Sequence, residues 1–418
     1  YGADLNGIKN RGYEVFRNVI RDTIQKSLED NKKQNMKLDI LMEVYIDIKM
    51  NIVENKEAIN DFIDCVIEIS DSVNSDNWNG EDVMGIFFNE FNRYKKKSES
   101  GQVFTPDHIT SLMYKILEVN ANDKILDAAC GSGAFLVKSM SNMIKEVGGI
   151  NTKEAKKIKE HSLFGIEFDR EIFALACANM MIHKDGKTNL EQLDSRDKEA
   201  SEWIKSKGIT KVLMNPPFER KYGCKKIVEN VLNSVPSGIK CAFIMPEKKM
   251  EKDKMGKLLE KHHLEAIIKL PEKLFDAGVT TSIYVFETGK KQVGEIYGCY
   301  IEDDGLERVK NQGRQDIKDK WMELENYWVD SIRKRNDTKY GTSQWIDPKK
   351  FLSYQKPKAE FVLYEEDFVK TMMNYLMFKN KIDVKEFSDK LINKTLYNSE
   401  ILKEDNNIVI KIKDAEDE

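Results

Sequence analysis

The spacing of hydrophobic residues changes near residue 100 and again near residue 310. Before the first change, hydrophobic residues recur at helical spacing, in residues 38–48, 59–69 and 83–94. Between the two changes, short apolar runs typical of strands alternate with amphipathic stretches typical of helices. After the second, charged sequence with helical patterns predominates. The pattern therefore predicts a helical segment, an α/β segment and a mostly helical extension.

Seven apolar runs in the α/β segment predict strands, at residues 124–129, 163–168, 189–194, 211–215, 239–246, 264–271 and 281–287. Helical patterns occupy residues 134–147, 170–183, 224–233 and 252–262, an alternation typical of βαβ units and a mostly parallel sheet. Only residues 272–280 separate the last two strands, which is too short for a parallel crossover. We expect the final strand to be antiparallel, and residues 148–161 to form an inserted loop.

Composition and charge narrow the class of protein. The 418 residues are 40% hydrophobic, which is enough for two or three folded domains. The net charge is −4, whereas a chain that binds nucleic acid alone is usually basic. If this chain acts on nucleic acid, phosphate contacts must come from a partner or from local basic clusters. Candidate clusters are residues 95–97, 220–221, 225–226 and 248–249, each of which can equally be a solvated charge run.

The cysteines, the histidines and the lengths of the apolar stretches exclude several classes of protein. The six Cys have no CxxC spacing and are expected to be free thiols in a reducing cytoplasm. The five His form no metal-ligand pattern, so no metal is expected. No apolar stretch approaches the ~20 residues that cross a bilayer, so we expect a cytoplasmic protein without membrane contact. The chain begins with Tyr1 rather than Met, and we expect further residues to precede it.

A glycine-rich turn follows the first predicted strand. It reads Asp127-Ala-Ala129-Cys-Gly131-Ser132-Gly133 and opens the next predicted helix. Glycines at such a position allow a tight turn and a close approach of the backbone to a ligand. The carboxyl ends of strands form the ligand crevice of open α/β sheets. Alone, the motif is also common in ordinary turns.

Acidic residues end the second and third predicted strands. Glu167, followed by Phe168, can accept hydrogen bonds from ribose hydroxyls. Asp194 can accept a hydrogen bond from an adenine amino group, and Asp197 is a competing candidate. Either aspartate can instead cap the helix that follows.

The most specific motif is Asn215-Pro216-Pro217-Phe218, directly after the fourth predicted strand. The two prolines fix the backbone and remove donors, which leaves carbonyl acceptors. The Asn215 side-chain oxygen and the Pro216 carbonyl can both accept from one amino group. Phe218 offers a ring on which an extruded base can stack.

The glycine-rich turn and residues 215–218 together resemble the motif pair of amino-methylating DNA methyltransferases. Residues 101–106, Gly-Gln-Val-Phe-Thr-Pro, resemble the cofactor motif on the methionine side in the group where that motif comes first. More narrowly, residues 80–290 resemble the modification subunit of type I restriction–modification systems, supported by residues 87–91, 270–275 and 280–286. The resemblance implies a class I, Rossmann-like methyltransferase fold with a seven-stranded, mostly parallel sheet. The domains would be an N-terminal helical domain (1–97), a catalytic domain (98–305) and a mostly helical extension (306–418).

The resemblance also implies the roles of individual residues toward S-adenosylmethionine. The methionine end would contact Phe104, Thr105 and Pro106; the amino-acid side would contact Asp127, Ala129, Gly131, Ser132 and Gly133; the ribose would contact Glu167; and the adenine would contact Asp194, with Phe168 or Phe135 packed on its ring. Asn215, Pro216, Pro217 and Phe218 would be catalytic, and Asn215 would also touch the cofactor. The third motif departs from the family, because it reads Leu-Asp-Ser where Gly-Asp-Ser is common.

The implied function is a site-specific DNA adenine-N6 methyltransferase that acts on a flipped adenine, as a type I modification subunit. Its partners would be double-stranded DNA, a specificity subunit and a second copy of the chain, with a restriction subunit as a further candidate. Alternatives are a self-contained or type IIG-like adenine methyltransferase, and a non-catalytic scaffold subunit that binds cofactor. Phe218 argues against a protein-amide methyltransferase, in which Tyr is typical, and Asn215 argues against methylation of cytosine, for which Ser is typical.

Overall fold

The computed structural model describes residues 4–12, 14–19, 21–22, 56–86, 105–183, 189–218, 223–250, 252–272, 274–275, 279–309, 313–357, 364–389, 399–404 and 407–412. The chain divides into two compact units, Tyr1–Gln355 and Lys356–Glu418. Several sequence predictions lie outside the described residues: the helix at 38–48, the basic clusters at 95–97 and 220–221, residues 87–91, and Phe104. The domain boundaries proposed at 97/98 and 305/306 stay predictions.

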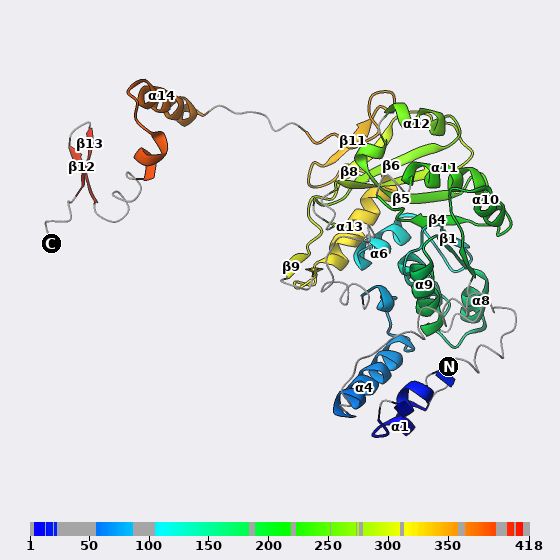
Figure 1. Ribbon diagram of the computed structural model, residues 1–418. Helices are drawn as coiled ribbons and strands as arrows, with labels where there is room; N and C mark the ends of the chain where they lie inside the picture. Colours follow the sequence, from blue (N-terminus) through cyan, green and yellow to red (C-terminus); the bar gives the residue numbers. More distant parts are fainter. Residues whose placement is uncertain are drawn as a thin grey trace. The chain divides into compact units, whose positions relative to one another are not determined.

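The first unit is built around a nine-stranded sheet with the order β11-β8-β6-β7-β5-β4-β1-β2-β3 (Figure 1). Its strands are β1 Ile125–Asp127, β2 Leu163–Glu167, β3 Asn189–Gln192, β4 Lys211–Met214, β5 Lys240–Pro246, β6 His263–Lys269, β7 Thr281–Glu287, β8 Ile296–Tyr300 and β11 Ser343–Ile346. Strands β1 to β5 pair in parallel, and β7 runs antiparallel between β5 and β6. The α/β class and the antiparallel seventh strand are confirmed.

The predicted count of seven strands is wrong, because β8 and β11 extend the sheet beyond β6. Strand β8 is buried along its whole length and pairs in parallel with β6. Strand β11 pairs antiparallel with β8 and forms the edge of the sheet. The sequence of β11, Ser-Gln-Trp-Ile, has only four residues, of which two are polar, so its hydrophobic pattern gives little indication of a strand.

Helices cover both faces of this sheet (Figure 1). One hydrophobic core joins the strands to α6 Asp107–Ile116, α7 Ala134–Glu146, α8 Lys153–His161, α9 Arg170–Ile182 and α13 Trp321–Lys334. The other joins them to α10 Lys198–Lys205, α11 Cys224–Ser234 and α12 Lys252–Leu259. Helix α8 replaces the loop predicted at 148–161. Thr152 caps it, but only Ala155 and Ile158 are buried, so its apolar face is narrow.

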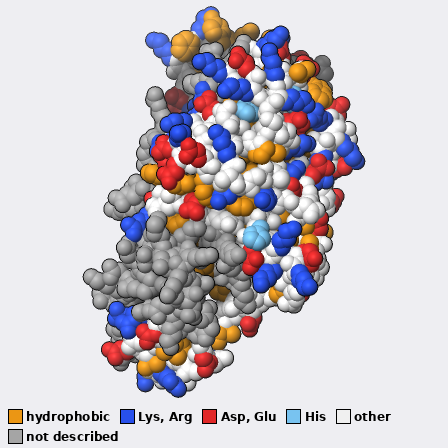
Figure 2. All heavy atoms as spheres, turned by 90° about the vertical axis from the view of Figure 1, so that its right-hand side faces the viewer, with side chains coloured by type: hydrophobic (Ala, Val, Ile, Leu, Met, Phe, Trp, Pro, Cys, Tyr) orange, Lys and Arg blue, Asp and Glu red, His pale blue; other side chains and the backbone are white. Residues whose placement is uncertain are grey.

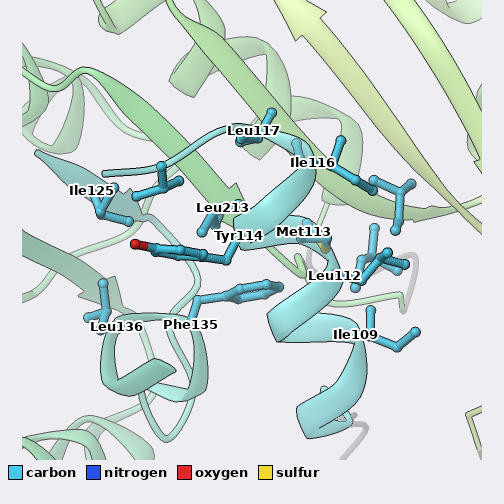
Figure 3. Packing of buried hydrophobic residues seen from close by; sticks show 14 of the residues in the cluster. Ile109, Leu112, Met113, Tyr114, Ile116, Leu117, Ile125, Phe135, Leu136 and Leu213 are labelled. Carbon is cyan, nitrogen blue, oxygen red and sulfur yellow. The ribbon is translucent and has the colours of Figure 1, made fainter. Parts of the chain in front are cut away.

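Alternate residues of the central strands pack on opposite faces of the sheet, as the geometry of a strand requires. In β4, Leu213 belongs to the first core, whereas Val212 and Met214 belong to the second. In the first core, Tyr114 of α6 lies across Phe135 of α7, beside Leu213 (Figure 3). Helices α6 and α7 are therefore fixed against the middle of the sheet, where the candidate site begins.

The other described elements lie outside the nine-stranded sheet. Helix α4 Lys56–Val73 confirms the helix predicted at 59–69, and its Ile59 and Ile63 pack with Ile8 of α1 Leu5–Ile8. A short 3-10 helix, η2 Glu247–Met250, follows β5. Strands β9 Glu307–Val309 and β10 Gly313–Gln315 form a hairpin, and the second unit contains α14 Glu365–Lys379, β12 Ser399–Glu404 and β13 Asn407–Ile412. The described residues beyond 305 thus contain both helices and strands, and the mostly helical extension at 306–418 stays a prediction.

Three further observations concern the described residues. None of their helices is long and apolar enough to span a membrane. They contain no group of three or more His, Cys, Asp and Glu side chains arranged to hold a metal ion. The six cysteines are free, and Cys65 alone among them is exposed.

Candidate active site

A pocket opens where β1, β2 and β4 end. The residues predicted from sequence that line it are Thr105, Asp127, Ala129, Gly131, Ser132, Glu167, Phe168, Asp194, Asn215, Pro216 and Pro217. Residues that line it without having been predicted to bind are Ala128, Cys130, Ala134, Asp169, Ile172, Ser195, Arg196 and Ile227, and Phe135 also reaches it. Motifs more than 100 residues apart in the chain thus share one cavity.

Three predicted residues do not line this pocket. Gly133 caps α7 in a left-handed conformation, with φ of 95°. Pro106 begins α6. Phe218 is only 9% exposed and packs edge-on against Phe275, with ring centroids 5.4 Å apart. The expected open face of Phe218 is therefore covered here by the Phe275 ring.

The glycine-rich turn approaches the pocket with its backbone. Gly131 has φ of 55°, a left-handed conformation that favours glycine, and a Cβ added there would meet nothing within 4 Å. Its N–H donates to Glu167 Oε2 at 3.0 Å, and the Ala129 N–H donates to Asp127 Oδ1 at 3.1 Å. The turn therefore ties the carboxylates of β1 and β2 to one loop and leaves open space beside Gly131.

The two carboxyl groups beside this turn are electrostatically unusual. Asp127 is 1% exposed, and burial raises its pKa to about 8, with the nearby Glu167 charge adding to the effect. Burial also raises the pKa of Glu167, while hydrogen bonds from the Asp169 and Gly131 backbone oppose that rise. The hydrogen-bond donors around these two carboxyl groups offset only part of the cost of burying them. This end of the pocket is therefore complementary to a cation.

Asp194 lines the pocket but is engaged by a neighbour. Arg196 Nε donates to its two carboxylate oxygens at 2.8 and 3.0 Å, and this pairing holds the pKa of Asp194 below its usual range. The Arg196 guanidinium also lies 5.9 Å from the centroid of the Phe168 ring. The competing candidate, Asp197, precedes α10 and does not line the pocket. Sequence reasoning missed Arg196, although it lies in the same motif.

The two aromatic candidates for packing on an adenine ring differ in access. The Phe168 side chain is 56% exposed at the rim, whereas Phe135 is 2% exposed. The Phe135 ring is packed in the core beside Tyr114 (Figure 3). Phe168 is therefore the ring with a free face for a ligand.

The Asn215 side chain is held in place by a hydrogen bond at the pocket wall. Its Nδ2 donates to Thr105 Oγ1 at 3.0 Å, which joins the end of β4 to the segment that leads into α6. This bond restricts rotation of the amide plane. Pro216 and Pro217 continue along the pocket wall. The motifs beginning at residues 101 and 215 therefore meet directly, 110 residues apart in sequence.

Basic side chains are spread over the face of the molecule in Figure 2 and are interleaved with acidic ones. In the predicted cluster at 225–226, Lys225 already pairs with Glu229 at 3.3 Å along α11. The assignment of this cluster and of residues 248–249 to phosphate contacts stays a prediction.

The sheet order, the antiparallel β7 and a pocket at the strand ends define a class I AdoMet-dependent methyltransferase fold. Solved structures share it. A modification subunit of a putative type I restriction enzyme from Vibrio vulnificus YJ016 superposes with a TM-score of 0.54 at 17% identity, covering 75% of this chain and 72% of that one. A structure from work on complex assembly and conformational transition of the type I R-M system gives 0.56 at 17% identity, covering 87% and 79%.

Residues 79–237 match the family model described as N-6 DNA Methylase. The type II restriction enzyme and methyltransferase RM.BcgI of Heyndrickxia coagulans is 30% identical over 340 residues, covering 75% of this chain and 51% of the relative. The EcoEI methylase subunit of Escherichia coli is 22% identical over 215 residues, covering 46% and 43%. The chain thus spans about half the length of these curated relatives.

Proposed function

We propose that this chain is a site-specific DNA methyltransferase that transfers the methyl group of S-adenosylmethionine to the N6 amino group of adenine. The observation that carries the proposal is the shared pocket of Asn215, Pro216 and the glycine-rich turn. The first two residues offer oxygens to an amino group, and the turn offers room for a methyl donor. The match of residues 79–237 to the N-6 DNA Methylase family model supports the same chemistry.

The residues of the pocket fit S-adenosylmethionine. The space beside Gly131 accommodates a ligand that touches the backbone. Asp127 and Glu167 suit the ammonium group and the ribose hydroxyls of the cofactor, because their raised pKa values favour a cationic or hydrogen-bond-donating neighbour. Asp194 suits the adenine amino group, and Phe168 suits the adenine ring. When bound, the cofactor supplies an electrophilic methyl group on a sulfonium.

The residues opposite the cofactor act on the base. Flipping adenine out of the duplex costs a few kcal/mol and exposes its amino group. The Asn215 side-chain oxygen and the Pro216 carbonyl accept hydrogen bonds from that group, which draws the nitrogen lone pair out of conjugation with the ring. Thr105 holds the Asn215 amide in the orientation this requires. The same oxygens stabilise the positive charge that develops on nitrogen, so catalysis comes from positioning and electrostatics.

The biological setting that fits this activity is restriction–modification. As a type I modification subunit, the chain would assemble with a specificity subunit and a second copy, act on double-stranded DNA, and associate with a restriction subunit. The net charge of −4 suits a protein whose partner supplies part of the DNA contact. A second candidate is the methyltransferase part of a combined restriction and modification enzyme. It is favoured by the 30% identity to RM.BcgI over 75% of this chain.

Replacement of Asn215 by Ala tests the proposal. We expect Asn215→Ala to lower methyl transfer to duplex DNA by at least about 100-fold, because one of two positioned oxygens is lost. Binding of S-adenosylmethionine should persist. The measurement is transfer of labelled methyl from the cofactor to DNA, with and without a specificity subunit, alongside calorimetric binding of the cofactor.

Asn233→Ala is the matched control, because the exposed Asn233 amide donates to the Glu229 carbonyl within α11, away from the pocket. This variant should transfer methyl groups at the wild-type rate. Normal transfer by Asn215→Ala, or label that appears in protein and not in DNA, would contradict the proposed function.

A further inference from the structure

Residues 76–86, which precede the catalytic fold in the chain, lie against α7. The Trp78 carbonyl accepts from Ser141 Oγ at 3.1 Å, and the Asn79 carbonyl accepts from the buried Lys138 Nζ at 2.6 Å. Gly80 lies closest to the helix: it has φ of 77°, and a Cβ there would come within 2.7 Å of Ser141 Cβ. The segment therefore needs glycine at this point in order to pack on α7.

The same segment reaches the glycine-rich turn through Asp82. Its carboxylate accepts a hydrogen bond from Ser132 Oγ and another from Asn179 Nδ2 at 2.8 Å. Asn179 Nδ2 also donates to the Ser132 carbonyl at 2.9 Å. Ser132 and Asn179 are 2% and 0% exposed. Ser132 is thus held at its side chain by Asp82 and at its carbonyl by Asn179.

The turn needs such support because it is conformationally soft. Gly131 and Gly133, on either side of Ser132, both have left-handed φ values of 55° and 95°. Glycine loses more conformational freedom on ordering than any other residue, so an unsupported turn would raise the entropic cost of binding. A hydrogen bond to a carboxylate is among the stronger ones available to a protein.

We propose that Asp82 is a positioning residue for cofactor binding, which acts through Ser132 to hold the glycine-rich turn in its binding conformation. Asp82 does not line the pocket, so its effect passes through the turn. The N-terminal segment is then part of the cofactor site, and a displacement of residues 76–86 weakens binding. Burial raises the pKa of Asp82, and the hydrogen bonds from Ser132, the Gly85 N–H and Asn179 oppose that rise. The proposal rests on the proposed function, in which this pocket binds S-adenosylmethionine.

The first experiment measures cofactor affinity of the full chain by calorimetry. We expect Asp82→Ala to raise the Kd and the KM for S-adenosylmethionine about tenfold, as loss of one charge-assisted hydrogen bond predicts. The value of kcat at saturating cofactor should stay within about twofold, because the turn does not touch the base. Asp61→Ala is the matched control. Asp61 is an exposed carboxylate of α4, outside residues 76–86, and the substitution should leave Kd unchanged.

A double-mutant cycle separates positioning from a general loss of stability. If Asp82 acts through Ser132, Asp82→Ala should change Kd by less than about twofold in a Ser132→Ala background. Full additivity of the two substitutions, or an unchanged Kd in Asp82→Ala, would overturn the inference.

Gly80→Ala is a second variant that leaves the polar contacts chemically intact. The added methyl group meets α7 and should displace the segment, raising Kd in the same direction. Gly12→Ala is its control: Gly12 also has positive φ, at 85°, but a Cβ there meets only Lys56 Cε at 4.0 Å. Equal Kd values for the two alanine variants would contradict the inference. If the wild-type chain binds no cofactor at all, the proposed function fails instead.

Discussion

Asp127 is the residue whose charge depends most directly on what occupies the pocket. It is almost completely buried at the end of β1, with one backbone N–H as its hydrogen-bond donor. Burial raises its pKa to about 8, so the carboxyl is largely protonated at pH 7 when no cation lies beside it. A cationic ligand would reverse that balance by favouring the carboxylate.

Binding of S-adenosylmethionine should therefore release a proton at pH 7. In the proposed complex the cofactor's ammonium group would lie beside Asp127 and lower its pKa from about 8, so the carboxyl would ionise as the complex forms. Calorimetry in several buffers measures this release, because the slope of the apparent binding enthalpy against the ionisation enthalpy of the buffer gives the number of protons released. Asp127→Asn should abolish the slope. Equal slopes in the two proteins would show that Asp127 does not face the ligand.

The same shift predicts how stability depends on pH. Because the folded pKa lies above the unfolded value, near 4, the folded state binds the extra proton between these two values. The Asp127 contribution to the free energy of unfolding is therefore fully present below about pH 4 and is lost as pH rises toward about 8. Urea denaturation across this range should show a steeper fall for the wild type than for Asp127→Asn, and parallel curves would contradict the assignment.

At the residue scale, the main residues that line the pocket were predictable from the sequence, but the side chains that contact them were not. Asp127, Glu167 and Asn215 were identifiable because each ends a strand and strand ends meet at one edge of the sheet. The pairing of Arg196 with Asp194 and the ring of Phe275 against Phe218 were not. These contacts depend on rotamers and on loops that meet only in the folded chain.

At the scale of elements, β2 shows why the central strands tolerate little change. At Gly165, a Cβ would lie 2.4 Å from Leu190 Cδ2, 2.9 Å from Leu136 Cδ1 and 3.1 Å from Cys130 Sγ. These atoms belong to β3, α7 and the glycine-rich turn. Gly165 therefore sets how closely α7 and the neighbouring strand approach β2.

Gly165→Ala should destabilise the protein by about 1–3 kcal/mol, because overpacking of a dense core forces neighbouring side chains to shift. Gly256→Ala is the contrasting variant. Gly256 lies within α12 with nothing within 4 Å of an added Cβ, and alanine there should stabilise the helix by about 0.5–1 kcal/mol. Urea denaturation measures both changes, and effects of the same sign would contradict the packing described for β2.

Elements with a strong hydrophobic period were predictable, and those without one were not. The seven runs from 124 to 287 and the four helices between them all occur in the structure. Helix α8 was missed because two buried residues in nine give a weak pattern. Strands β8 and β11 were missed because they follow the region in which strands and helices alternate, and pairing with β6 decides their place.

At the scale of the whole molecule, the acidic net charge and the fraction of each relative's length that this chain spans support the same expectation about DNA recognition. The net charge is −4, and the chain spans 51% of RM.BcgI and 43% of the EcoEI methylase subunit. We therefore expect DNA recognition to depend on protein regions beyond the catalytic fold. Residues 76–86, which lie outside the sheet, contact the glycine-rich turn through Asp82.

The most direct measurement is base-resolution detection of methylated bases in the DNA of a host that expresses this chain with its neighbouring genes. We predict N6-methyladenine at one recurring sequence, and none at that sequence when Asn215→Ala is expressed instead. Unmodified adenine in the wild-type host, methylation on the amino group of cytosine, or identical patterns for wild type and variant would contradict it.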